Sequence, residues 1–310
     1  TAPATPASVS VPEATNGINA SEASDGVEVL VTLPSDAVAG DVITVSIDGG
    51  TAVTHTVTAA EVAAISTPIT VTLPQSAISA AGEGAATITT TVTDSSGNVS
   101  TPITTNVTID TVAPGTAPAT PASVSVPEAT NGINASEASD GVEVLVTLPS
   151  DAVAGDVITV SIDGGTAVTH TVTAAEVAAI STPITVTLPQ SAISAAGEGA
   201  ATITTTVTDS SGNVSTPITT NVTIDTVAPG TSPATPASVS VPEATNGINA
   251  SEASDGVEVL VTLPSDAVAG DVITVSIDGG TAVTHTVTAA EVAAISTPIT
   301  VTLPQSAISA

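Results

Sequence analysis

Carboxylates and carboxamides are the side chains through which this sequence is best equipped for chemistry. Its 310 residues include 30 Asp and Glu but no Lys or Arg, so the formal net charge is -30. Each complete copy of an internal repeat carries eleven acids, and ten of them lie in or beside predicted turns. Without protein cations, such acids are solvated, protonated or metal-bound. Hard oxygen ligands suit calcium best, so we predict bound Ca2+. The simpler alternative is that the acids only keep a secreted protein soluble.

Nucleophilic and acid–base side chains give little support for catalysis. The absence of Cys and Lys excludes a thiolate nucleophile and a Schiff base. His55, the one histidine of its copy, shares the strand parity of Val53 and Val57. No nucleophile-elbow pattern surrounds any serine, and a strand histidine usually packs or lies at a rim. We therefore predict a protein that is not an enzyme. Glu28, Glu61 and Glu83 are interpreted as solvated charges.

The composition also excludes several classes of partner and cross-link. Nucleic acid binding uses Lys, Arg and aromatic stacking, and the sequence contains none of these residues. Disulfides and Lys–Asn isopeptide bonds are excluded in the same way. No apolar stretch reaches 18 residues, so we expect no membrane insertion of this segment. We expect any targeting signal to lie outside this sequence.

The sequence repeats with a period of 115 residues, and the copies are identical except that Ala2 and Ala117 correspond to Ser232. A period of this length has the size of an independent domain. We predict three domains, at residues 1–115, 116–230 and 231–310. The third ends before the counterparts of the last two predicted strands, so we expect it to form no complete sandwich alone. We also expect the chain to belong to a longer protein.

Alternating aliphatic and polar residues indicate about seven strands in each copy. Asp48-Gly49-Gly50 reads as a hairpin turn, and the only helical hint covers residues 59–65. This pattern predicts an all-β fold: tandem immunoglobulin-like antiparallel β-sandwich domains with cores of small aliphatic residues. The predicted strands lie near residues 8–11, 27–33, 42–47, 52–58, 68–73, 86–93 and 99–109.

In such a sandwich, the first inter-strand loop lies where the chain leaves the domain, and the loop before the last strand lies where it enters. Loops of successive copies should therefore meet, and we predict a calcium site at that junction. The predicted ligands at the first junction are Asn16, Asn19, Glu22, Asp25, Asp110, Asp209 and Asn213. Their counterparts elsewhere in the repeat complete the predicted ligand set: Asp94, Asn98, Asn131, Asn134, Glu137, Asp140 and Asp225.

Three runs in each complete copy, the first of which also occurs in the third copy, resemble bacterial Ig-like extender repeats of giant, calcium-dependent adhesins secreted by type I (RTX) systems. In the first copy they are GINASEA at 17–23, VTDSSGNVS at 92–100 and IDTVAP at 109–114. The resemblance covers every copy. It implies an extracellular, calcium-stiffened stalk on the bacterial cell surface that projects a distal ligand-binding domain for cell adhesion or biofilm formation. That ligand domain is expected outside this sequence.

Mechanical extension is thus the predicted function, with neighbouring repeats of the same chain as the immediate partners. Near-identical copies add length without adding chemical variety. The alternative is that the repeats are themselves weak adhesive modules that act by avidity on a surface, a mineral or ice. A face formed by Thr87, Thr89, Thr91 and Thr93 suggests this alternative, although threonine is also an ordinary outward strand residue.

Overall fold

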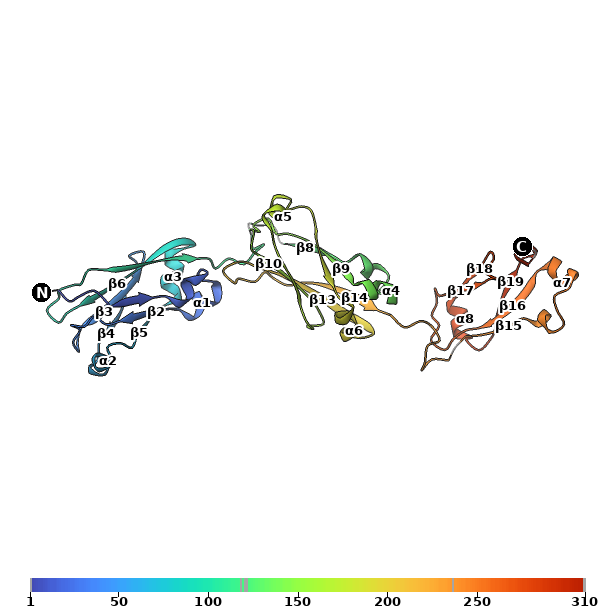
Figure 1. The fold of residues 1–310 in the computed structure, drawn as a ribbon, viewed down its shortest axis with the longest axis horizontal. Helices are drawn as coiled ribbons and strands as arrows, with labels where there is room; N and C mark the ends of the chain where they lie inside the picture. Colours follow the sequence, from blue (N-terminus) through green and yellow to red (C-terminus); the bar gives the residue numbers. More distant parts are fainter. Residues whose placement is uncertain (1, 118, 120–121, 236, 309–310) are drawn as a thin grey trace. The chain divides into compact units, whose positions relative to one another are not determined.

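The protein is described here by a computed structural model that covers residues 2–117, 119, 122–235 and 237–308 (Figure 1). It divides into two compact units. The first, Thr1–Asp225, holds the first two copies of the repeat, and the second, Thr226–Ala310, holds the third. The boundaries of three domains after residues 115 and 230 stay predictions.

The first copy alternates strands with short helices. Its strands are β1 (Ser8–Ser10), β2 (Val27–Thr32), β3 (Val42–Ile47), β4 (Val53–Thr56), β5 (Ile69–Leu73), β6 (Gly84–Thr93) and β7 (Ile103–Ile109). Its helices are η1 (Pro12–Thr15), α1 (Ala20–Asp25), α2 (Ala59–Ala63) and α3 (Gln75–Ala81). Each predicted strand therefore has an observed counterpart.

The second and third copies repeat this order. The second has β8 (Ser123–Ser125), η2 (Pro127–Thr130), α4 (Ala135–Asp140), β9 (Val142–Thr147), β10 (Val157–Ile162), β11 (Val168–Thr171), α5 (Ala174–Ala178), β12 (Ile184–Leu188), α6 (Gln190–Ala196), β13 (Gly199–Thr208) and β14 (Ile218–Ile224). The third has β15 (Ser238–Ser240), η3 (Pro242–Thr245), α7 (Ala250–Asp255), β16 (Val257–Thr262), β17 (Val272–Val275), β18 (Val283–Thr286), α8 (Ala289–Ala293), β19 (Ile299–Leu303) and α9 (Gln305–Ile308).

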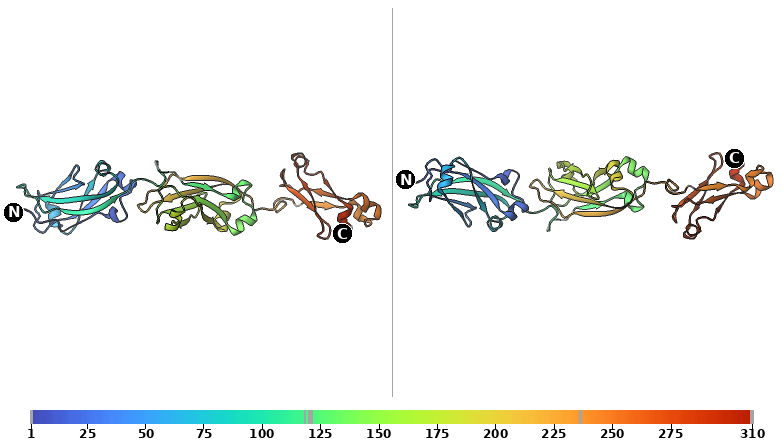
Figure 2. Two further views of the ribbon diagram at one scale, coloured as in Figure 1. Left: turned by 90° about the horizontal axis from the view of Figure 1, so that it is seen from above. Right: turned by 90° about the horizontal axis from the view of Figure 1, so that it is seen from below.

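Two antiparallel sheets form each of the first two copies, and Figure 2 shows their strands in layers. The first copy has sheets β1-β2-β5 and β4-β3-β6-β7, and the second has β8-β9-β12 and β11-β10-β13-β14. The strands bury alternate residues, as β5 does with Ile69, Val71 and Leu73. The predicted all-β sandwich fold is thus confirmed. The turn at Asp48-Gly49 is also confirmed: the two residues have φ values of 45° and 68°, and Gly50 N donates to Ile47 O at 2.8 Å within the connection from β3 to β4.

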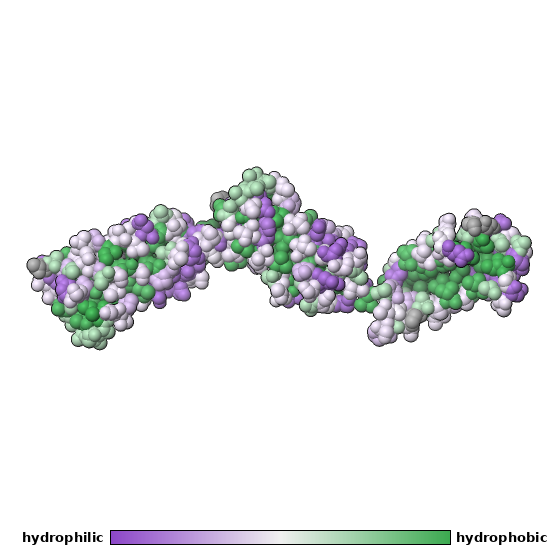
Figure 3. All heavy atoms as spheres, in the orientation of Figure 1, coloured by the Kyte–Doolittle hydropathy of each residue, from purple (hydrophilic) through white to green (hydrophobic). Residues whose placement is uncertain are grey.

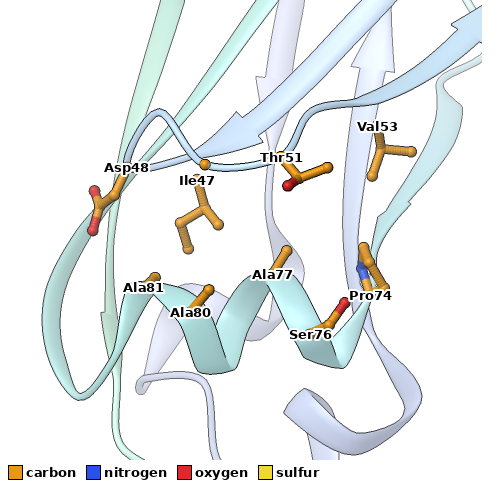
Figure 4. A pocket seen from close by; sticks show the side chains of 10 residues that line it. Ile47, Asp48, Thr51, Val53, Pro74, Ser76, Ala77, Ala80 and Ala81 are labelled. Atoms are coloured by element: carbon orange, nitrogen blue, oxygen red, sulfur yellow. The ribbon is translucent and has the colours of Figure 1, made fainter.

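The expectation of a single helical segment was wrong. α2 lies inside the predicted range, but α1 and α3 were missed. α1 begins because Asn19 and Glu22 form a capping box, a signal that the sequence displays as Asn-x-x-Glu. In Figure 4, Ala77, Ala80 and Ala81 of α3 point toward Ile47. These alanine side chains are too small to fill the space between α3 and the loop that connects β3 to β4, so a pocket remains there.

The third copy has less sheet than the other two. Within residues 237–308, β17 pairs with β18 alone, whereas β10 in the second copy also pairs with β13. Its buried aliphatic residues form two smaller clusters. Figure 3 shows hydrophobic atoms on the surface of this copy, and the exposed fraction of Val272 is 58%. The strands of the third copy therefore bury less of their surface than strands of identical sequence in the first two copies.

Candidate functional site

The most densely connected polar cluster lies where the first two copies meet. The loop between β13 and β14 of the second copy reaches Asp110, which follows β7, and the N-terminal end of α1. Five hydrogen bonds cross this junction: Asn213 Nδ2 to Asp110 O (2.7 Å), Ser211 Oγ to Asp110 Oδ2 (2.9 Å), Ala20 N to Asn213 Oδ1 (2.8 Å), and the Nδ2 atoms of Asn19 and Asn16 to Ser211 O (3.0 and 3.3 Å). Two non-adjacent segments of the first copy thus bind one loop of the second.

Asn213 is the centre of this network. Its amide nitrogen donates to Asp110 O and also to Asp209 Oδ2 (2.8 Å), while its oxygen accepts from the Ala20 N–H. Both amide hydrogens and the carbonyl oxygen are therefore used. Only 5% of Asn213 is exposed. A buried and fully bonded carboxamide of this kind fixes the geometry of its partners.

The same loop is preformed in the first copy, where no such partner covers it. Asp94 Oδ1 accepts from the backbone N–H groups of Ser96 and Asn98, and Asn98 Nδ2 donates to Asp94 Oδ2 at 2.7 Å. The Asn98 side chain, followed by its backbone N–H, lowers the pKa of Asp94. Asn98 is exposed, whereas its counterpart Asn213 is buried. The loop thus keeps its own hydrogen bonds and becomes buried at the junction.

Two backbone elements bring the first-copy partners into place. Ile18 N donates to Thr108 O (2.8 Å) and Asp110 N donates to Ile18 O (3.0 Å), which holds the segment before α1 beside the end of β7. Asn19 then caps α1, because its Oδ1 accepts from the N–H groups of Ser21 and Glu22. Its Nδ2 remains available for Ser211 O. One asparagine therefore both begins a helix and contacts the next copy.

Gly17 allows the two copies to approach closely. Its φ is +104°, and a Cβ atom on it would lie 2.9 Å from Ser211 Oγ. Ser211 is itself only 4% exposed. Any side chain at residue 17 would therefore collide with the loop that carries the junction hydrogen bonds, in addition to straining the backbone.

Two further acids anchor the connecting segment. Thr111 donates to Glu83 through its backbone N–H (2.9 Å to Oε2) and its hydroxyl. Gly115 N donates to both carboxylate oxygens of Asp151, at 2.9 and 3.1 Å. Glu83 is exposed, as expected of a solvated surface charge, and it also accepts these two hydrogen bonds. Both ends of the segment 111–115 are fixed to a carboxylate, one in each copy.

Most of the predicted calcium ligands for this junction lie near one another. Asn16, Asn19, Asp110 and Asn213 contact the neighbouring copy directly, Asp209 shapes the loop through its bonds to Ser211 and Asn213, and Glu22 Oε2 accepts from Asn19 N at 2.9 Å. Asp25 is the exception, because it ends α1 while the contacts are at the helix start. Asp94 and Asn98 lie in the exposed loop of the first copy.

The remaining predicted ligands lie at the far end of the second copy, where they repeat the local geometry of the first. Asn134 and Glu137 form the capping box of α4, Asn131 ends η2, Asp140 ends α4, and Asp225 N donates to Ile133 O at 2.9 Å. This set therefore has the same short-range arrangement as Asn16, Asn19, Glu22, Asp25 and Asp110.

The donors at the first junction fit calcium in their chemistry, since they are carboxylate, carboxamide and backbone carbonyl oxygens. Several of these oxygens already accept hydrogen bonds, as Asp110 Oδ2 does from Ser211. Among the described residues, no group of three or more His, Cys, Asp or Glu side chains lies close enough together to hold a metal ion by itself. Amide and carbonyl oxygens would therefore have to contribute. The ligand roles stay predictions.

Glu61, expected to be a solvated surface charge, has a partly exposed side chain that also joins His55 to a helix. Its carboxylate oxygens lie 2.9 and 3.1 Å from His55 Nε2, and Oε2 accepts from the Thr58 backbone N–H at 2.8 Å. The Thr58 N–H, followed by His55, lowers the pKa of Glu61. The pairs His170–Glu176 and His285–Glu291 repeat this contact at 2.9 Å. The histidine therefore ties a strand to the capping box of the following helix.

No protein-family model and no curated protein matches this sequence. The chain is similar to the solved structure of a Ca2+-stabilized adhesin that helps an Antarctic bacterium reach out and bind ice, with 30% identity over 98% of this chain and 67% of that one and a TM-score of 0.38. A second solved chain gives structural insight into host cell surface retention of a 1.5-MDa bacterial ice-binding adhesin. It is 25% identical to this chain over 98% of this chain and 89% of the solved one, with a TM-score of 0.35.

Fibronectin(III)-like modules of Clostridium thermocellum CbhA are 14% identical over 71% of this chain and 95% of that one, with a TM-score of 0.40. The sandwich fold is shown by the strand pairing and the buried residues of the copies themselves. None of the helices in the described part of the chain is long and apolar enough to cross a membrane.

Proposed function

We propose that this chain is a structural extender of a large bacterial surface adhesin, a stalk outside the cell that projects a distal ligand-binding domain for adhesion or biofilm formation. The junction between the first two copies carries the proposal. Five hydrogen bonds join the β13–β14 loop of the second copy to the first copy, and every residue that makes them recurs in the repeat. The same joint is therefore encoded wherever one complete copy follows another, as a spacer of adjustable length requires.

The negative charge at the junction is the reason to propose a bound cation there. Asp110 and Asp209 bring two carboxylates to one seam, and the sequence contains no Lys or Arg to balance them. Calcium would be held by these two acids together with the amide and carbonyl oxygens around them, and would supply the missing positive charge. We infer that the ion stiffens a joint whose hydrogen bonds already define its direction, and that it stabilises the fold by mass action.

Small-angle X-ray scattering of the 310-residue chain, with calcium chloride and then with chelator, tests this function. We expect a larger maximum dimension and a higher melting temperature with calcium. The double variant Asp110→Ala, Asp209→Ala should lose the change in dimension. Glu28→Ala with Glu143→Ala is the matched control, because it removes two exposed strand acids and equal charge.

Two results would contradict the proposal in different ways. If wild-type dimensions and melting temperature are unchanged by calcium, the acids only solvate the chain, and adhesion by the repeats themselves becomes the better account. If the double variant retains the wild-type response, calcium acts elsewhere and Asp110 and Asp209 are not its ligands. Binding of an isolated complete copy to a surface, a mineral or ice would support the adhesive alternative directly.

A further inference from the structure

Asp156 is a buried carboxylate with an unused oxygen. Only 1% of the residue is exposed. Its Oδ2 accepts from the Val153 N–H at 2.9 Å, and its backbone N–H and C=O are bonded to Val153 and Val172. Its Oδ1 is buried and has no hydrogen-bond partner. Leaving a charged oxygen unpaired away from water is costly, so this atom requires an explanation.

The register of the sheet places a second acid opposite Asp156. Val157 pairs with Thr208 at the end of the β10–β13 ladder, and the next residues along the two antiparallel chains are Asp156 and Asp209. Residues opposite one another in such a ladder have neighbouring side chains, and like charges in these positions repel. Two acids, Asp156 and Asp209, therefore follow the last paired residues at this end of the sheet.

Further acids act on Asp156. Burial raises the pKa of Asp156, and the negative charges of Asp209, Asp151 and Asp110 raise it further, while the Val153 N–H opposes this shift. Asp110 belongs to the first copy and the others to the second. Because the sequence has no Lys or Arg, no side chain with a permanent positive charge can balance this group.

The first copy contains the corresponding acids, Asp41 and Asp94, but no residue that corresponds to Asp110 lies beside them in the described part of the chain. Asp41 is 1% exposed with an unpartnered Oδ1, and the pairing of Val42 with Thr93 places Asp41 opposite Asp94. Among the described residues, no counterpart of Asp110 lies at this pole. The two poles therefore provide an internal comparison between an acid pair alone and an acid pair with a third carboxylate.

We propose that Asp156 Oδ1 is the buried ligand of a divalent cation, calcium by its oxygen chemistry, which Asp156 and Asp209 bind together and Asp110 helps to neutralise. This inference rests on the proposed calcium-stiffened junction and names a ligand that the set predicted from the sequence does not contain. It also accounts for the orphaned oxygen, which would bind the ion directly. Asp156 would then connect the core of the second copy to the seam.

Calcium titration of the full chain by calorimetry, with thermal melting in calcium and in chelator, tests the assignment. We expect Asp156→Asn to weaken the tightest calcium-binding phase by at least about tenfold, as loss of metal-site residues does. In chelator the same variant should melt at or above wild type, because it removes a buried, repelled charge. With calcium its melting temperature should fall below wild type. This reversal of sign distinguishes a ligand from a residue that only packs.

Two matched variants complete the test. Asp41→Asn makes the same change at the pole without Asp110, and should leave the calcium-dependent change in maximum dimension intact, whereas Asp156→Asn should abolish it. Glu143→Gln removes an exposed charge and should change neither measurement. Magnesium chloride in place of calcium chloride should give a smaller stabilisation, since magnesium retains its waters.

The inference is overturned if Asp156→Asn binds calcium as tightly as wild type while Asp110→Ala with Asp209→Ala does not. The calcium-stiffened junction would survive that result. It is also overturned if Asp156→Asn raises the melting temperature equally with and without calcium, which would show that a proton occupies the group. If wild type binds no calcium, this inference and the calcium component of the proposed function fail together.

Discussion

The side-chain amide of Asn213 donates to the backbone carbonyl of Asp110 over 2.7 Å, and the two residues belong to different copies of the repeat. This bond needs no metal. The junction therefore has two components: hydrogen bonds that set the contact, and a surplus of carboxylates that the proposed calcium ion would balance. The first can be tested in chelator and the second only with calcium, so the two contributions are separable by experiment.

Asn213→Ala should loosen the junction even in chelator. It leaves Ala20 N, Asp110 O and Asp209 Oδ2, which are part-buried, without their partner. An unpaired polar group costs up to about 1–3 kcal/mol where water cannot replace the lost bond. We expect faster hydrogen exchange at the Ala20 amide. Asn98→Ala is the matched control in the first copy, because that exposed residue bonds only within its own loop. Unchanged exchange at Ala20 in Asn213→Ala would contradict the role of this side chain.

Gly17→Ala should separate the copies by a steric route. The new Cβ would lie 2.9 Å from Ser211 Oγ. Gly40→Ala is the control, because Gly40 has a similar φ of +100° and no atom within 4 Å of an added Cβ. Both variants should lose roughly 1–3 kcal/mol from backbone strain. Only Gly17→Ala should also broaden the distribution of distances between spin labels or fluorophores placed on the two copies, because the clash loosens the contact between them. Equal distributions for the two variants would argue against a close seam.

Low pH should weaken the hydrogen bonds by which Glu61 and its counterparts in the other copies attach a short helix to the preceding strand. The Thr288 backbone N–H, followed by the Thr288 hydroxyl and His285, lowers the pKa of Glu291 from its ordinary 4.5 to about 2. A folded pKa below the unfolded value gives stability that is present above about pH 4.5 and is lost as the pH falls toward about 2. The pKa values of Glu61 and Glu176 are lowered for similar reasons.

Thermal melting between pH 6 and pH 2 measures this effect. The triple variant Glu61→Gln, Glu176→Gln, Glu291→Gln should show a weaker dependence on pH than wild type. Glu28→Gln, Glu143→Gln, Glu258→Gln removes the same charge from exposed strand positions and serves as the control. The acids are partly exposed, so the difference should be modest. Identical pH profiles for the two triple variants would show that the hydrogen bonds of these glutamates to threonine and histidine add no stability that depends on pH.

The strands could be predicted from the sequence because each buries alternate residues, a period that Ile43, Val45 and Ile47 display directly. The contact between the loops that carry Asn19 and Asn213 could also be predicted, because the order of the strands places these loops at facing ends of successive copies. The helix at Ala20–Asp25 was missed because six residues carry too little periodicity, although its capping box was legible. Asp156 was missed because its burial and its opposition to Asp209 depend on sheet register, which no short segment of sequence specifies.

The third copy provides a test of how far the sandwich depends on its second sheet. Residues 257–303 have the same sequence as 27–73, so any difference in protection comes from their surroundings. In the described part of the third copy, β17 lacks the strand that covers β3 in the first, and Val272 is 58% exposed. We expect a protease that cleaves beside aliphatic residues to cut within 231–308 before it cuts the first two copies. A chain extended by the sequence of residues 81–115 should restore resistance, because it supplies the missing strands. Equal resistance of all three copies in the 310-residue chain would show that one three-stranded sheet and a hairpin protect the core as well as a complete sandwich does.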